Sequence, residues 1–220
     1  MKRIVIAVPN TGQCVIELVK FFTTFKIPKG YKVRIATRKG YPLASNRNAI
    51  VKEFLKDLDN EWLLTFDSDI VPPRDILDMI KYNKGIVAPI VFAFQQGVAQ
   101  PLIMKRVSRD NFMFTPAKEL VYDEETGLIE ADGTGAGCLL IRRDVLEKIK
   151  RPWFEFLTDK DGIAISGEDY QFCVKCQEKG YKILIDTTKE ASHLTRLDIR
   201  EIAHIESAMA NLLPLSKWKK

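Results

Sequence analysis

The 220-residue chain has few cysteines and no long apolar run, and these two features narrow the classes of protein to which it can belong. Its cysteines are Cys14, Cys138, Cys173 and Cys176. Only Cys173 and Cys176 have the spacing of metal ligands, and a structural zinc site needs a second such pair, which the sequence lacks. No apolar run approaches the ~20 residues that span a bilayer. The sequence therefore predicts thiols that pack as small apolar side chains, in a chain without a transmembrane segment.

The sequence also lacks a secretory signal and a block of like charges. Met1-Lys2-Arg3 leads directly into a short apolar stretch at residues 4–8, which is too brief for the core of a signal peptide. We therefore expect a reduced, cytoplasmic setting. The net charge is only +5, and no run of five or more like charges occurs. We expect no nucleic-acid partner, although a face for a diphosphate or an anionic lipid fits this mild excess.

Over its first 92 residues the sequence alternates between strand and helix patterns. Apolar stretches typical of buried strands lie at residues 2–8, 31–37, 61–66 and 85–92. Helical patterns at 15–25, 46–58 and 74–82 separate them, and Ser45 or Asn46 is the expected cap of the second helix. This order predicts an α/β fold with a mostly parallel central sheet and helices on both faces.

The second half of the chain is less regular. We expect a loop at residues 95–100, strands at 102–107, 138–141 and 183–185, and helices at 143–150 and 167–180. A turn is expected at Glu125-Thr126-Gly127. Ser166 and Asp169 have the spacing of a capping box at the start of the 167–180 helix. Residues 199–213 have the period of an amphipathic helix and precede a lysine-rich end at 217–220.

Two aspartates end the third expected strand. On an extended chain alternate side chains share a side, so Asp67 and Asp69 point together beyond the strand's carboxyl end, where open α/β sheets bind ligands. Adjacent anions repel each other unless a cation or solvent screens them. Hard cations such as Mg²⁺ or Mn²⁺ take carboxylate oxygens and leave positions open for a diphosphate. The alternative is a solvated turn, since Asp is common after strands.

Other polar motifs accompany this pair in a fixed order: Asn46-Arg47-Asn48, Phe66-Asp67-Ser68-Asp69-Ile70, Gly133-Thr134-Gly135-Ala136-Gly137, Gly167-Glu168-Asp169-Tyr170 and His193. Together they resemble GT-A glycosyltransferases, particularly family-2-like enzymes, over most of the chain. The resemblance implies a GT-A-like, Rossmann-type sandwich and transfer of a sugar from a nucleotide-sugar donor to a hydroxyl acceptor. It implies a single domain with a nucleotide-binding half (1–92), an acceptor-binding half (93–198) and a C-terminal helix (199–220).

The resemblance also implies a Mn²⁺ or Mg²⁺ ion between the protein and the donor diphosphate. Asp69 would be the main ligand, Asp67 would lie near the ribose or the metal, and His193 would complete the metal shell. A packed or surface residue is the alternative for His193. The implied nucleotide contacts are Pro9, Asn10, Thr11, Arg47, Asp67 and Ser68. Relatives often carry an acidic residue for the base at the end of the second strand, where this chain has Thr37-Arg38-Lys39, so a UDP-sugar is only the default donor and a GDP-sugar is the alternative.

On the acceptor side, the resemblance makes Asp169 the general base of an inverting transfer, with Glu168 orienting the acceptor or serving as the second choice for the base. Gly133, Gly135 and Gly137 would let the backbone approach the donor sugar and the acceptor, or they form a plain turn. Trp153 would line the acceptor site or belong to the core.

Two other functions stay open at this stage. A sugar nucleotidyltransferase shares the general fold, but its first loop usually carries glycines with Arg and Lys, and this chain has Pro-Asn-Thr-Gly-Gln at 9–13. A binding module that keeps the nucleotide-sugar pocket without turnover is the other. For the expected 199–213 helix we predict packing against the domain, with peripheral membrane contact as the alternative.

Overall fold

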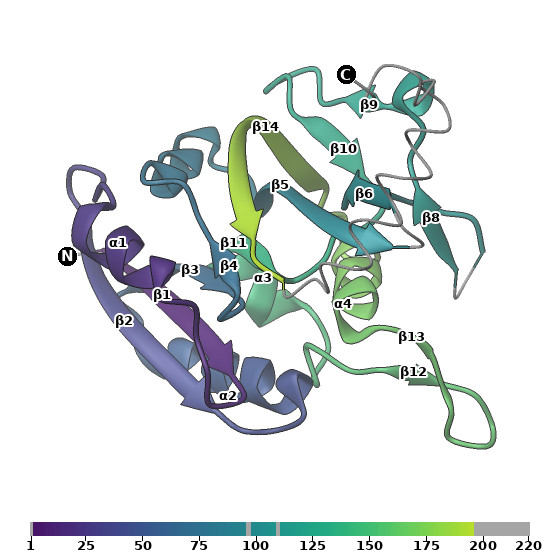
Figure 1. Cartoon of the computed structure of the whole chain (residues 1–220), viewed down its shortest axis with the longest axis horizontal. Helices are drawn as coiled ribbons and strands as arrows, with labels where there is room; N and C mark the ends of the chain where they lie inside the picture. Colours follow the sequence, from purple (N-terminus) through teal and green to yellow (C-terminus); the bar gives the residue numbers. More distant parts are fainter. Residues whose placement is uncertain (1, 96–97, 109–110, 196–220) are drawn as a thin grey trace, which may run out of the picture.

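A computed structural model describes residues 2–95, 98–108 and 111–195 (Figure 1). The expected 199–213 helix and the lysines that follow it lie outside the described residues, so both stay predictions. None of the described helices is long and apolar enough to cross a membrane. Cys138, Cys173 and Cys176 are buried free thiols, as predicted, whereas Cys14 is exposed.

The centre of the molecule is one mixed sheet. Its strand order is β2-β1-β3-β11-β5-β14-β10-β9, with bounds Lys32–Lys39, Arg3–Asn10, Asn60–Phe66, Cys138–Arg142, Ile86–Gln95, Ile183–His193, Ile129–Ala131 and Val121–Tyr122. β1 pairs in parallel with β2 and β3, and β5 pairs in parallel with β14. β11 is antiparallel to both β3 and β5, so those two strands share one direction. The predicted α/β class with a largely parallel sheet is confirmed, and the reversed strand β11 is an addition to it.

Helices cover both faces of the sheet because its strands carry apolar side chains on both faces. Val5 and Ala7 of β1 belong to the core cluster of Phe54, which lies on α2 (Leu43–Lys56), together with residues of α3 (Arg143–Lys148) and α4 (Glu168–Gln177). Ile4 and Ile6 belong to the opposite cluster, with residues of α1 (Glu17–Thr24) and of the 3₁₀ helix η1 (Ile76–Tyr82). Because successive side chains of a strand point to opposite faces, these continuous apolar strands contribute to the core on both sides of the sheet.

Two predicted helix caps are wrong. α2 begins at Leu43, after a cis Tyr41–Pro42 bond, and the backbone N–H groups of Ser45 and Asn46 already bond to the Pro42 carbonyl within its first turn. Neither of those residues is therefore the cap. α4 begins after Gly167 without a side-chain cap, so the expected capping box of Ser166 and Asp169 does not form.

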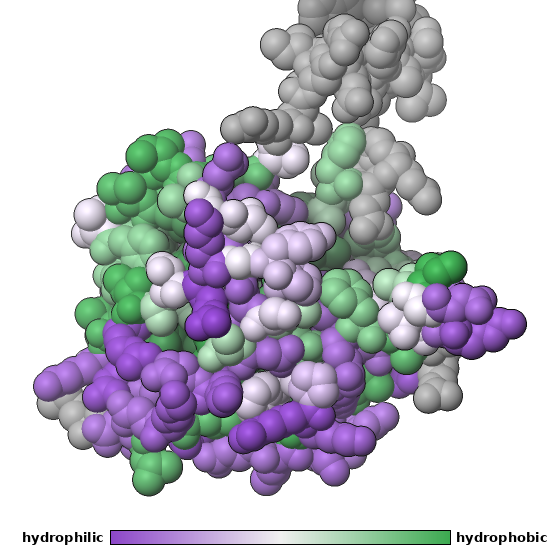
Figure 2. Space-filling model, turned by 90° about the horizontal axis from the view of Figure 1, so that it is seen from below, coloured by the Kyte–Doolittle hydropathy of each residue, from purple (hydrophilic) through white to green (hydrophobic). Residues whose placement is uncertain are grey.

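Most of the remaining elements are short. β6 (Val98–Pro101) pairs antiparallel with the end of β5, so the expected loop at 95–100 is wrong at residues 95 and 98–100, while residues 96–97 lie outside the described residues. The others are β7 (Met104–Arg106), β8 (Phe112–Phe114), η2 (Ala117–Glu119), β12 (Leu157–Thr158) and β13 (Ala164–Ser166). The turn at 125–127 forms as predicted. The β12–β13 hairpin projects from the body of the molecule at the right of Figures 1 and 2, with Ile163 64% exposed on it.

β14 is much longer than the predicted strand at 183–185. Its register shifts between Asp186 and Glu190, and it then continues to His193. There it pairs with the two-residue strand β4 (Ile70–Val71), with His193 opposite Ile70. This pairing brings the end of β14 beside the Asp67–Asp69 segment.

Candidate functional site

The Asp67-Ser68-Asp69 segment follows β3 and is held by backbone hydrogen bonds from three directions. The Asp67 N–H donates to the Gly137 carbonyl at 2.9 Å, Val15 N–H donates to the Ser68 carbonyl at 2.9 Å, and Leu194 N–H donates to the Asp69 carbonyl at 2.9 Å. The segment therefore joins the glycine loop before β11, the loop after β1 and the end of β14. Such a turn is fixed in place although it belongs to neither helix nor strand.

Arg47 connects two predicted site carboxylates. It lies on α2 and is only 4% exposed. Its Nη2 is 2.5 Å from Asp67 Oδ1, and its Nη1 is 2.7 Å from Glu168 Oε1 at the start of α4. The structure thus brings together residues from three separate motifs. The burial of this cation was not predicted, since the family resemblance made Arg47 a nucleotide contact.

The charge on Asp67 is strongly influenced by this environment. Burial raises the pKa of Asp67 to about 6, although Arg47 opposes the rise and the nearby Asp69 adds to it. A carboxyl group of this kind needs its arginine partner to stay ionised at neutral pH.

Asp69 is paired with His193, which the sequence left as either a ligand or a packed residue. His193 Nε2 is 3.7 Å from Asp69 Oδ2. This pairing lowers the pKa of Asp69 and raises the pKa of His193. His193 Nδ1 is 2.8 Å from the Phe92 carbonyl oxygen, which can only accept, so Nδ1 carries the proton.

In the neutral ring, the Nε2 lone pair therefore faces a carboxylate oxygen. Two acceptors that face each other repel unless a cation, either a proton or a metal ion, lies between them. Metal-binding histidines commonly donate their other ring N–H to a carbonyl in this way. Asp69 and His193 could therefore serve as two ligands of a divalent cation such as Mn²⁺ or Mg²⁺.

Asp67 does not join them as a third ligand in this geometry. Within residues 2–95, 98–108 and 111–195, no group of three or more His, Cys, Asp or Glu side chains converges closely enough to hold a metal ion. One oxygen of Asp67 is occupied by Arg47 instead. The three-ligand set of Asp67, Asp69 and His193 stays a prediction.

Asp169, the predicted general base, is in the first turn of α4. Its Oδ1 accepts the Tyr170 N–H at 2.8 Å. Burial, and then the charge of Glu168, raises the pKa of Asp169. Glu168 itself is paired with Arg47, whereas no cation pairs with Asp169 among the described residues.

The glycine loop passes between the two carboxylate sites. A Cβ atom at Gly135 would lie 3.7 Å from Asp169 Oδ2 and only 2.9 Å from Leu102 Cδ1, and one at Gly137 would lie 3.8 Å from Asp67 Oδ2. A Cβ atom at Gly133 would meet the stacked rings of Phe112 and Tyr170, a pair that the sequence did not predict. The loop therefore brings bare backbone close to both carboxylates.

A cavity of about 520 Å³ opens beside Asp69. Thr11, Ser68 and Asp69, which were predicted, line it together with residues that were not: Gln13, Cys14, Val15, Glu17, Leu194 and Thr195. These residues lie in the loop after β1, at the first position of α1 and at the end of the described chain, and no local pattern marks them.

Pro9 and Asn10 lie apart from this cavity lining. Pro9 is buried in β1, and Asn10 organises the loop by accepting the Gly12 N–H on its Oδ1 and the Asn46 side-chain N–H on its carbonyl. Trp153 is 4% exposed, and its indole N–H donates to the Leu146 carbonyl at 2.7 Å. The structure supports the core interpretation of Trp153, because the residue belongs to the buried cluster that also contains Phe54.

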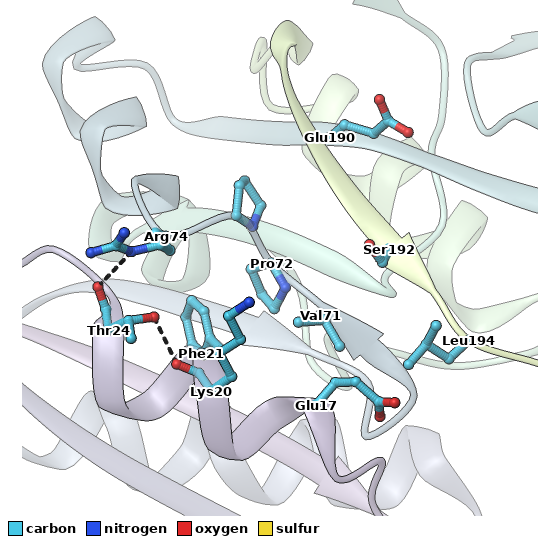
Figure 3. A pocket seen from close by; sticks show the side chains of 11 residues that line it. Glu17, Lys20, Phe21, Thr24, Val71, Pro72, Arg74, Glu190, Ser192 and Leu194 are labelled. Carbon is cyan, nitrogen blue, oxygen red and sulfur yellow. Dashed lines mark hydrogen bonds between the residues drawn. The ribbon is translucent and has the colours of Figure 1, made fainter.

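A second cavity, of about 360 Å³, adjoins the first and shares Glu17 and Leu194 with it (Figure 3). Lys20 and Phe21 of α1 lie on one side and Ser192 of β14 on the other. Arg74 lies at its edge, where its Nε donates to the Thr24 carbonyl at 3.1 Å.

Solved structures match the chain in fold. A197 from STIV aligns with a TM-score of 0.61 and 20% identity, over 88% of this chain and 86% of that one. GalNAc-T7, crystallised with UDP, GalNAc and Mn²⁺, aligns with a TM-score of 0.57 and 12% identity, over 90% of this chain and 44% of that one. The fold is GT-A-like. No protein-family model and no curated protein matches the chain.

Proposed function

We propose that this chain is a metal-dependent, inverting glycosyltransferase that moves a sugar from a nucleotide-sugar donor to an acceptor hydroxyl. The observation that carries the proposal is the placement of two differently equipped carboxylate sites on one edge of a GT-A-like sheet. Asp69 and His193 form the site that suits a cation. Glu168 and Asp169 form the site that suits proton transfer. Arg47 connects the two sites, because it pairs with both Asp67 and Glu168.

On the donor side, the cavity beside Asp69 would take the nucleoside diphosphate, with Thr11 and Ser68 in its wall. Asp69 and His193 would hold Mn²⁺ or Mg²⁺, which offsets the negative charge of the diphosphate as it leaves. GalNAc-T7, which has a similar fold, was crystallised with UDP and Mn²⁺, and this supports the proposal. The donor is a UDP-sugar by default, with a GDP-sugar as the alternative.

On the acceptor side, Asp169 is the better base of the two acids. Burial raises its pKa, as is common for catalytic acids and bases, and its Oδ2 lies toward the bare backbone of Gly135. Glu168 is instead held in an ion pair with Arg47. The acceptor oxygen attacks the anomeric carbon as its proton passes to Asp169, and the bond from that carbon to the diphosphate oxygen breaks. The products are an inverted glycoside and a nucleoside diphosphate.

Cys14 offers a direct test of the donor site. It lines the cavity and is exposed, while the other three cysteines are buried, so alkylation of the native protein reports on Cys14 alone. With Mn²⁺ and UDP or GDP at about ten times Kd, we expect alkylation to slow roughly tenfold, and chelation of the metal to reverse this. Turnover is then measured as release of nucleoside diphosphate from a panel of nucleotide sugars and acceptors.

Each outcome separates the candidate functions. Protection of Cys14 with release of nucleoside diphosphate supports a transferase. Protection without release from any donor supports the non-catalytic binding module. Release of pyrophosphate from a nucleoside triphosphate and a sugar phosphate supports a nucleotidyltransferase. Absence of both protection and release would overturn the proposal.

A further inference from the structure

Arg47 is placed differently from an arginine that binds a phosphate at a surface. It is 4% exposed, and each of its Nη atoms is already paired with a carboxylate of the protein. Those carboxylates, Asp67 and Glu168, are 20 and 121 residues away in sequence and belong to different elements. A planar guanidinium holds two such partners at a fixed spacing, which an ammonium group does not.

The backbone under Arg47 is also fixed, on both sides. The Asn46 side chain donates to the Asn10 and Gly40 carbonyls at 3.2 and 2.8 Å. The Asn48 side chain donates to the Phe154 carbonyl at 2.6 Å and accepts the Phe154 N–H at 3.0 Å. Three successive side chains of α2 thus reach three different parts of the molecule, and Arg47 is the middle one.

This arrangement has a cost in stability. The Nε atom of Arg47 is buried and has no hydrogen-bond partner among the described residues. A buried donor without a partner is unfavourable. The two ion pairs of Arg47 therefore form although its Nε–H is left unpaired, which fits a side chain whose position is set by Asp67 and Glu168.

We propose, building on the function above, that Arg47 is a positioning residue that sets the spacing between Asp67 on the donor side and Glu168 on the acceptor side. It acts through Glu168 on the first turn of α4, which carries Asp169. The two substrates' sites therefore form one rigid unit, although they come from opposite halves of the chain. A contact between Arg47 and the nucleotide is not needed for this role.

The test uses Arg47→Lys in the full chain. Lysine keeps the charge but reaches only one carboxylate, so we expect kcat to fall roughly 10²-fold, because small misplacements of reacting groups are costly. The affinity for Mn²⁺ with nucleoside diphosphate, read from Cys14 alkylation, should change by less than about threefold, since the Asp69–His193 pair is untouched.

Arg143→Lys is the matched control. Arg143 bonds to the Leu55, Asp57 and Asn60 carbonyls, so its loss should lower the thermal midpoint and leave kcat unchanged.

A double-mutant cycle keeps the test valid if Arg47→Lys does not fold. Asp67→Asn and Glu168→Gln are compared singly and together, by kcat and by urea unfolding. Coupling through a shared arginine predicts clear non-additivity, by about fivefold or more, in both readouts. If the double variant shows only the product of the two single effects on kcat and the sum of the two on unfolding free energy, the proposal is overturned. It is also overturned by an Arg47→Lys variant with normal kcat and weakened nucleotide affinity. If the wild-type chain shows no turnover, the proposed function fails, while the unfolding cycle still decides whether Arg47 couples the two acids.

Discussion

The candidate catalytic side chains each depend on one neighbour for their orientation. The Phe92 carbonyl fixes the His193 ring, the Tyr170 N–H holds one oxygen of Asp169, and Arg47 holds Glu168. Supporting contacts of this kind keep reactive groups within the narrow range of geometry that catalysis requires. At the scale of single residues, function should therefore respond both to the reactive groups and to these neighbours.

Substitution of Asp69 tests the metal assignment. Asp69→Asn should abolish Mn²⁺-dependent binding of the nucleoside diphosphate and leave the fold intact, because the Asp69 side chain is half-exposed and faces His193. Calorimetry of nucleotide binding with and without Mn²⁺ measures this. Asp78→Asn, at an exposed position on η1, is the control. Unchanged affinity in Asp69→Asn contradicts the assignment, and normal metal binding by His193→Ala would make that residue structural.

Substitution of the paired acids on α4 separates catalysis from binding. A base acts on the acceptor, so Asp169→Asn should leave donor and metal affinity nearly unchanged and lower transfer by roughly 10²–10⁴-fold. Glu168→Gln should cost less, since its role is to orient. Donor titration alongside initial rates gives both quantities. If Glu168→Gln is inactive while Asp169→Asn turns over normally, the two roles are reversed.

At the scale of elements, the sheet was predictable and the route of β14 was not. The continuous apolar runs of β1, β3 and β5 are typical of buried strands, whatever their partners are. The end of β14, from Asp186 to His193, is polar and contains a register shift, and it forms a strand because β4 and β5 offer it hydrogen bonds. Tertiary partners of this kind leave no local pattern, so the position of His193 beside Asp69 came from family resemblance alone.

The same limit applies to the lining of the site. Asp67 and Asp69 follow a buried strand, which made them candidates from their position alone. Gln13 and Leu194 line the cavity because two distant segments meet there, and the burial of Arg47 depends on Asp67 and Glu168 being near. A sequence pattern identifies residues by type and spacing, whereas these properties arise only when the chain is folded.

The turn between β9 and β10 allows a prediction about pH and stability. Asp123 is buried and accepts hydrogen bonds from the Thr126 hydroxyl at 2.7 Å and from Lys182 at 3.1 Å. The Thr126 bond above all, with Lys182 and Lys84, lowers the pKa of Asp123 to about 2. This value lies below the ordinary Asp pKa of about 3.9 in an unfolded chain. The carboxylate therefore stabilises the fold above about pH 4, and this contribution is lost as the pH falls through about 2.

Asp123→Asn should accordingly lower the free energy of unfolding at pH 7 by about 1–2 kcal/mol. The difference between variant and wild type should shrink steadily as the pH is lowered from about 4 toward 2. Urea unfolding across this range measures both. Glu124→Gln, at the exposed neighbouring position, should show no difference at any pH. A difference in unfolding free energy between wild type and Asp123→Asn that stays constant down to about pH 2 contradicts the prediction.

At the scale of the whole molecule, the outstanding question is where residues 199–213 bind. Their apolar positions, Ile199, Ile202, Ile205, Met209 and Leu212, fall near one helical face in the sequence. We predict that this face packs on the domain. The full chain should then fail to sediment with anionic vesicles at low salt, and Ile202→Asp with Ile205→Asp should lower its thermal midpoint. Ser207→Asp is the control. Strong vesicle binding that the double variant loses without unfolding would favour membrane contact.

The reversed strand β11 has a consequence for how the chain is made. It fills the gap between β3 and β5, yet it is synthesised after both of them. Until residues 138–142 leave the ribosome, two apolar strands have unpaired edges that face each other, which is the kind of surface on which nascent chains aggregate. The first 92 residues therefore do not complete their own core, and the sheet closes only once the later segment has inserted. A fragment that ends before Cys138 should be insoluble, and a ribosome-bound chain should become resistant to protease only after Arg142 has emerged.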